Sequence, residues 1–156
     1  EAAQAGVDGL ILPDMPPDEA GPLRGPAAAA GIPLIFLLAP TSTAERRTFV
    51  ARQSQGFVYY VSLTGITGAK LINLADVAKN VEKIRKVTNV PVAVGFGVAT
   101  SEDAAKVAAI ADGVIVGSAI VKKIAAYQQK PEMVKHVAAF VRSLKTAMQA
   151  AQPKPR

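Results

Sequence analysis

Apolar positions along the chain fall into two kinds of segment that alternate. The first kind is a short run that is apolar almost throughout, which is typical of strands buried on both faces. Such runs predict strands at residues 8–12, 32–39, 57–61, 90–94 and 112–116. The second kind has apolar residues at spacings of three and four, which is typical of a helix with one buried face. The sequence therefore predicts a strand followed by a helix, five times over, in an α/β fold with parallel strands.

Residues that favour helix ends mark where these helices begin. Ser42 with Glu45 and Thr100 with Asp103 have the spacing of a capping box, and Asn73 is a suitable N-cap for the helix after it. Residues 118–127 predict a short helix. The last helix is expected to open at a proline, and the apolar stripes of these helices are at Leu74, Val77, Val81 and Ile84, and, after Pro131, at Val134, Val137, Val141, Leu144 and Met148.

Two stretches near the start depart from this regular pattern. The first six residues, EAAQAG, resemble the last turn of a helix closed by Gly6, which indicates that the chain is a piece of a longer protein. Further on, Pro22 and the pair Gly25-Pro26 fall within one helical segment. Proline inside a helix costs about 3 kcal/mol or more, so we expect this helix to be kinked, broken or to begin late at Pro26.

Glycines follow the fourth and fifth predicted strands. Alternating strands and helices are typical of an open doubly wound sheet or of a (β/α)8 barrel, and neither the Rossmann nor the P-loop motif is present. Gly97 follows one strand, and Gly117 with Ser118 follows the next, just before a short helix. Backbone N–H groups at such a junction can bind an anion, so the pair predicts a phosphate site; the alternative is that the glycines only turn the chain.

Composition narrows the classes of function. The net charge is +6, but the basic residues are spread along helices, which favours small anionic substrates over nucleic acid. The chain has no cysteine and one histidine, so we expect no disulfide and no metal site, and a cytoplasmic location. The longest apolar run, residues 32–40, is well short of the ~20 residues that cross a membrane. We therefore expect neither a nucleic acid nor a membrane as partner.

Four stretches together resemble the tryptophan synthase α subunit family: ILPDMPPDEA (11–20), YYVSLTGITGA (59–69), VGFGV (94–98) and DGVIVGSAIV (112–121). That family is a (β/α)8 TIM barrel that cleaves indole-3-glycerol phosphate, by a retro-aldol step, to indole and glyceraldehyde 3-phosphate. The resemblance implies an incomplete barrel of about five βα units, strands 4 to 8. It also implies a single domain over residues 1–156, with a disordered tail at 152–156.

The resemblance implies roles for individual residues. The substrate phosphate would be bound by Gly68, Phe96, Gly97, Gly117 and Ser118. The substrate cavity would be lined by Ile11, Leu37, Tyr59 and Thr67, with Thr67 on a lid loop. Because neighbouring residues of a strand face opposite ways, only one of Tyr59 and Tyr60 is expected to face the cavity.

Catalysis and assembly are the remaining implications. The family's catalytic Glu and Asp lie on the second strand and its loop; neither is in this sequence, so no catalytic residue is assigned and the chain alone is expected to be inactive. Asp14, Met15 and Pro16 match a loop that faces the β subunit in an αββα complex; Asp14 could instead cap a helix begun by Pro16 and Pro17. No cofactor is expected in this subunit, since pyridoxal phosphate belongs to the β partner.

Two other functions remain open. The chain could be a phosphate-binding or interaction module without catalysis. It could also be part of a histidine- or tryptophan-pathway isomerase, since such barrels bind phosphate after the same strands. The stretches PDMPP and SLTGITGA favour the α subunit.

Overall fold

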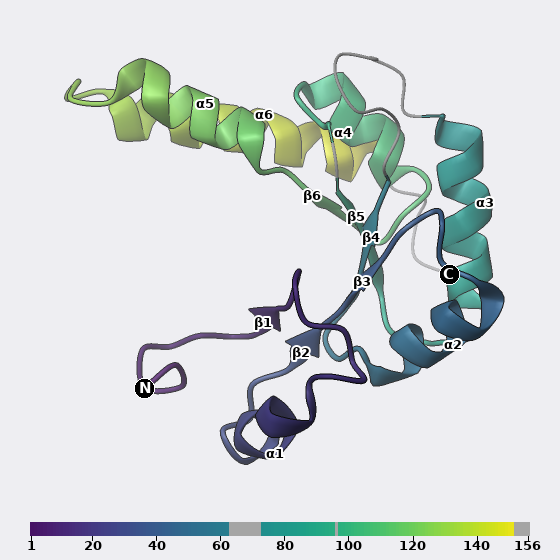
Figure 1. Ribbon diagram of the computed structural model, residues 1–156. Coiled ribbons are helices and arrows are strands. Elements are labelled where there is room, and N and C mark those ends of the chain that lie inside the picture. Colours follow the sequence, from purple (N-terminus) through teal and green to yellow (C-terminus); the bar gives the residue numbers. More distant parts are fainter. Residues whose placement is uncertain (63–72, 96, 152–156) are drawn as a thin grey trace. The chain divides into compact units, whose positions relative to one another are not determined.

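A computed structural model describes residues 1–62, 73–95 and 97–151, in which strands and helices alternate along the chain (Figure 1). The strands are β1 (Leu10–Ile11), β2 (Leu34–Ile35), β3 (Leu37–Leu38), β4 (Val58–Val61), β5 (Val92–Gly95) and β6 (Gly113–Ile115). The helices are α1 (Gly21–Ala29), α2 (Ala44–Gln53), α3 (Leu74–Arg85), α4 (Ser101–Ala108), α5 (Ser118–Tyr127) and α6 (Met133–Ala151). The α/β class predicted from the sequence is confirmed.

The strands form two sheets with parallel pairing. In the smaller sheet β1 pairs with β2, with Leu10 opposite Leu34. The larger sheet has the order β3-β4-β5-β6. Phe36 separates β2 from β3, so the single strand expected at 32–39 is two short ones, because its first half pairs with β1 and its second half with β4.

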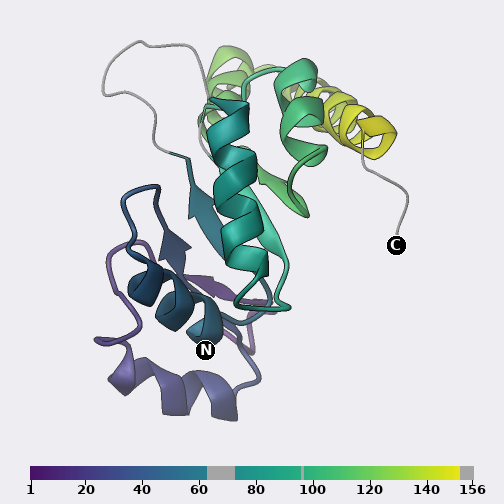
Figure 2. The same cartoon turned by 90° about the vertical axis from the view of Figure 1, so that its right-hand side faces the viewer.

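The chain divides into two compact units, which we describe separately: Glu1–Val61 with Lys79–Ala93, and Ser62–Ala78 with Val94–Arg156. In the first unit α2 packs on β3, and the core contains Phe36, Leu38 and Val50, each at most 2% exposed. In the second unit α4 packs on β6 and on α6 (Figure 2), and α5 runs beside α6. The single domain over residues 1–156 stays a prediction, and its tail at 152–156 lies outside the described residues.

Two of the three predicted caps are confirmed. Asn73 accepts a hydrogen bond from the Asp76 N–H at 3.3 Å at the start of α3, and Thr100 forms a complete capping box at the start of α4. The cap predicted for α2 is wrong by one residue. The Ser42 hydroxyl accepts the Ala39 N–H instead, at 3.1 Å, and Thr43 caps α2 by accepting the Arg46 N–H.

The expectation of a broken or late helix around Pro26 is also wrong. α1 begins at Gly21 and continues through Pro26 to Ala29. Pro22 lies in its first turn, where the missing N–H costs nothing, so only Pro26 removes a bond from the helix interior. The helix ends in a Schellman motif at Gly31, whose φ is +67°.

Two further sequence predictions concern the two ends of the described chain. Gly6 has a φ of +78°, and the Val7 N–H donates to the Ala2 carbonyl at 3.1 Å, which confirms the helix-like turn at residues 1–6. At the other end, α6 begins at Met133 rather than Pro131, and Val134 is 70% exposed. Among the described residues, no helix combines the length and the hydropathy needed to cross a membrane.

Candidate functional site

The N-terminus of α5 is the candidate anion site. The chain leaves β6 through Val116, and Gly117 is the N-cap of α5 with no side chain capping the helix. The Gly117 carbonyl accepts the N–H groups of Ile120 and Val121, at 3.0 and 3.1 Å. The preceding N–H groups, of Ser118 and Ala119, have no acceptor within the helix, because the first turn of any helix has none. Together with the helix dipole they favour a bound anion.

The space in front of this helix is open. Apart from its two chain neighbours, a Cβ atom placed on Gly117 would meet no heavy atom of the described residues within 4 Å, and both Gly117 and Ser118 are exposed. An anion could therefore approach the backbone closely, and a side chain at position 117 would occupy the same space.

Gly97 follows β5, the strand next to β6 in the sheet. Its φ is +74°, a left-handed conformation that residues with a side chain rarely adopt. Gly97 is exposed, whereas the next residue, Val98, is 4% exposed. Gly97, Gly117 and Ser118 therefore lie in the same unit, after the last residues of neighbouring strands. Gly68 and Phe96, the other two predicted phosphate residues, lie outside the described residues.

The start of α4 differs from that of α5 in its hydrogen bonding. The Asp103 N–H donates to the Thr100 hydroxyl at 3.1 Å, and the Asp103 carboxylate accepts the N–H groups of Thr100 and Ala99 at 3.1 and 3.3 Å. The hydrogen bond with Thr100 contributes most to holding the pKa of Asp103 below its usual value. A carboxylate of the protein thus already occupies the N-terminus of α4, so α5 is the better candidate for binding an external anion.

Three of the four predicted cavity residues, Ile11, Leu37 and Tyr59, lie in the other unit. Leu37 of β3 is opposite Tyr59 of β4, so their side chains share one face of the sheet. Tyr59 is half-buried and Tyr60 is 2% exposed, as the alternation along a strand predicts. Ile11 lies on β1, opposite Ile35, and is 45% exposed. Thr67 lies outside the described residues.

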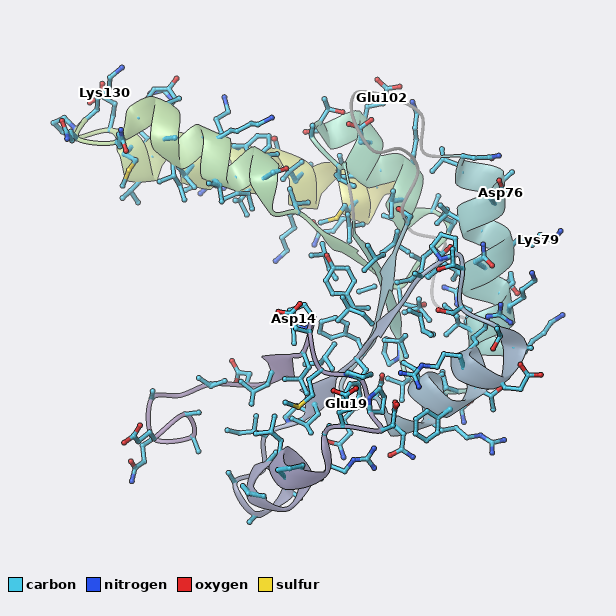
Figure 3. The ribbon with its side chains drawn as sticks, viewed as in Figure 1. Asp14, Glu19, Asp76, Lys79, Glu102 and Lys130 are labelled. Carbon is cyan, nitrogen blue, oxygen red and sulfur yellow. The ribbon has the colours of Figure 1, made fainter. Side chains whose placement is uncertain are left out.

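The loop between β1 and α1 contains the predicted interface residues. Asp14 is exposed at the tip of this loop (Figure 3), and Met15 and Pro16 are half-buried. The alternative role of Asp14 as a helix cap is wrong, because no helix begins at Pro16. A turn follows instead, closed by the Glu19 N–H donating to the Pro16 carbonyl at 3.0 Å, and α1 begins only at Gly21.

Three carboxyl groups of the described residues have lowered pKa values. Hydrogen bonds to Asp18, Glu45 and Asp103 lower the pKa of all three carboxyl groups and so favour their charged form. His136 is exposed and stacks on Tyr127, with ring centroids 4.1 Å apart, a contact that the sequence did not indicate. Within the described part of the chain, no three His, Cys, Asp or Glu side chains gather as a metal site would require.

Comparison with known proteins decides the family. The family model described as tryptophan synthase alpha chain matches residues 1–149. The chain belongs to the tryptophan synthase alpha chain family. A tryptophan synthase alpha chain of Nitrosococcus oceani is 46% identical over 153 residues, which are 97% of this chain and 56% of that relative.

Solved structures of tryptophan synthase agree with this fold. The alpha subunit from Legionella pneumophila matches with a TM-score of 0.81 at 36% identity, covering 96% of this chain and 55% of that one. Tryptophan synthase from M. tuberculosis, in its aminoacrylate-bound form, matches with a TM-score of 0.78 at 35% identity, covering 94% and 52%. The chain thus spans about half the length of these relatives, and its fold is that of an incomplete tryptophan synthase alpha TIM barrel.

Proposed function

We propose that this chain supplies the phosphate-binding part of a tryptophan synthase alpha chain, which cleaves indole-3-glycerol phosphate to indole and glyceraldehyde 3-phosphate. The observation that supports this most is the open, uncapped N-terminus of α5 at Gly117 and Ser118, directly after β6. Family membership supports the choice of substrate. A phosphate dianion is well matched to such a helix end, because several N–H donors and the dipole act on it together.

The chain's part in the reaction is to bind and orient the substrate. Holding the phosphate at one end fixes where the scissile carbon–carbon bond lies, and such positioning lowers the barrier by converting an encounter into an intramolecular step. We assign no proton transfer to any residue of this chain. Because a positioned acid or base contributes about 10²–10⁴-fold, we propose that the chain alone has no measurable lyase activity.

Partners and location complete the proposal. A β subunit containing pyridoxal phosphate would bind at Asp14, Met15 and Pro16 in an αββα complex, and this chain would need no cofactor of its own. The match to tryptophan synthase structures supports such a partner. A cytoplasmic location is consistent with a chain that has no cysteine.

A titration followed by amide NMR tests the proposal. Glycerol phosphate should shift the amide signals of Gly97, Gly117 and Ser118, and glycerol, which lacks the phosphate, should not. Indole release from indole-3-glycerol phosphate is measured in the same samples and should be absent. Glycerol phosphate leaving these three amides unmoved would contradict the phosphate role, and turnover by the chain alone would contradict the assignment of the chemistry to residues outside it.

A further inference from the structure

The β1–α1 loop (residues 12–20) has little regular structure of its own. It contains prolines at 13, 16 and 17 and one backbone turn, and both Asp14 and Glu19 are exposed. Its two ends are fixed: the Leu12 N–H donates to the Ile35 carbonyl at 3.0 Å, and Ala20 is fully buried at the start of α1. The backbone between these ends needs other groups to hold it in one conformation.

Arg24 supplies such a group from α1. Its Nη2 donates to the Pro17 carbonyl at 2.6 Å, and its Nη1 donates to the Gln53 side-chain oxygen at the end of α2. Arg24 is half-buried, as is Gln53, and Pro17 is buried. Bonds to a charged donor in such surroundings are among the stronger ones, and the guanidinium reaches both partners at once because its donors lie in one rigid plane.

A second arginine contacts the same loop from outside. Arg46 of α2 forms an ion pair with Asp18 at 2.7 Å, and hydrogen bonding from Arg46 lowers the pKa of Asp18. The two side chains are 38% and 54% exposed. Exposed pairs of this kind contribute little to stability, so this contact is the weaker of the two.

We propose that Arg24 is a positioning residue for the β-subunit interface. It holds the β1–α1 loop in the conformation that presents Asp14 and Met15, with Gln53 orienting its guanidinium. This inference rests on the proposed function for its partner, but the fixing of the loop stands on the contacts of Arg24 alone. A loop held in its bound conformation loses less entropy on binding, so removing Arg24 should weaken association through its effect on the loop.

The test uses Arg24→Met, which retains the apolar stem and removes every donor, and Arg24→Lys, which restores a charge and donors. Arg52→Met on α2 is the matched control, because Arg52 is exposed and has no ion pair among the described residues. Hydrogen exchange of the Asp18, Glu19 and Ala20 amides reports on the loop, with the Tyr59 amide of β4 as the internal reference. Affinity for a purified tryptophan synthase β subunit is measured on the same samples.

Arg24→Met should raise exchange at the three loop amides about tenfold and leave the Tyr59 amide unchanged. It should also raise the dissociation constant for the β subunit about tenfold, with Arg24→Lys recovering part of both effects and Arg52→Met changing neither. If Arg24→Met fails to fold, Gln53→Leu decides the question in its place. That variant should raise hydrogen exchange of the loop amides by a smaller factor. Unchanged loop exchange in Arg24→Met, or in Gln53→Leu if that variant decides, would overturn the proposal. An unmodified chain that does not bind the β subunit would overturn the proposed partner instead, and the exchange data would still decide the role of Arg24.

Discussion

Thr100 and Gly117 hold equivalent places at two successive strand-to-helix junctions, and they leave the following helices in different states. Thr100 and Asp103 satisfy the first N–H groups of α4 from within the chain. Gly117 has no side chain to do so, and the first turn of α5 stays open to solvent. The residues at the N-cap and N3 positions therefore separate a helix whose first N–H groups have partners within the chain from one whose first N–H groups are open to an anion.

The capping box at the start of α4 predicts a pH dependence of stability. The folded-state pKa of Asp103 lies below its ordinary value of 3.8, so the carboxylate stabilises the fold above that value, and this contribution is lost as the pH falls through the folded pKa. Asp103→Asn should therefore flatten the fall in unfolding free energy on acidification, measured by urea unfolding from neutral to acidic pH. Glu132→Gln, at an exposed carboxyl group before α6, is the control. If the unfolding free energy of Asp103→Asn fell on acidification as steeply as that of the unmodified chain, this role would be contradicted.

Several residue-level features could be predicted from the sequence, because each depends only on residues nearby in the sequence. The Thr100 box, the Asn73 cap and the positive φ of Gly6 are of this kind. The sequence could not decide between Ser42 and Thr43 as the cap of α2, since both are good caps and only the tertiary path of the chain directs the Ser42 hydroxyl to the Ala39 N–H. The sequence shows Arg24 only as a positive charge, because the fold brings its two hydrogen-bond acceptors, on Pro17 and Gln53, close to it.

At the scale of elements, the sequence predicted best where one helix or strand decides its own limits. α5 has the predicted bounds of 118–127, because a glycine precedes it and an apolar stripe fills it. The division of 32–39 into β2 and β3 was not predictable, because it depends on which strands pair with each half. Pro26 in α1 shows that a local penalty can be outweighed by the rest of the helix.

α1 offers a matched pair of glycine substitutions. Gly25 lies inside the helix with open space at its Cβ position, and Gly31 lies at its end with a φ of +67°. Gly25→Ala should change the unfolding free energy little, because the gain of about 0.5–1 kcal/mol in backbone entropy is offset by crowding between the new Cβ and the ring of Pro26. Gly31→Ala should lower it by about 1 kcal/mol, because alanine is strained in the left-handed region. Thermal or urea unfolding measures both, and a loss in Gly25→Ala as large as that in Gly31→Ala would contradict the assignment of the helix end.

At the scale of the whole molecule, each sheet ends in an apolar strand. Among the described strands, β1 is at one end of its sheet and β6 at one end of the other. An edge of unpaired backbone with apolar side chains favours pairing with another chain. We therefore predict concentration-dependent association of this chain, with Ile11→Lys reducing it because Ile11 is exposed on β1. Sedimentation velocity measures this, and a monodisperse monomer at high concentration would be the contrary result.

The central claim is that the junction of β6 with α5 binds phosphate, and calorimetric titration of glycerol phosphate into Gly117→Val tests it most directly. The fold should tolerate the substitution, because no described residue other than its chain neighbours lies within 4 Å of the Cβ position, and circular dichroism should match that of the unmodified chain. Phosphate binding should be lost, because the valine side chain fills the space in front of the Ser118 and Ala119 N–H groups. Ser118→Ala should weaken binding only about two- to tenfold, since it removes one hydroxyl donor and keeps the backbone N–H. Equal affinity of Gly117→Val and the unmodified chain would contradict the claim, and Gly97 and Gly117 would then serve only to turn the chain.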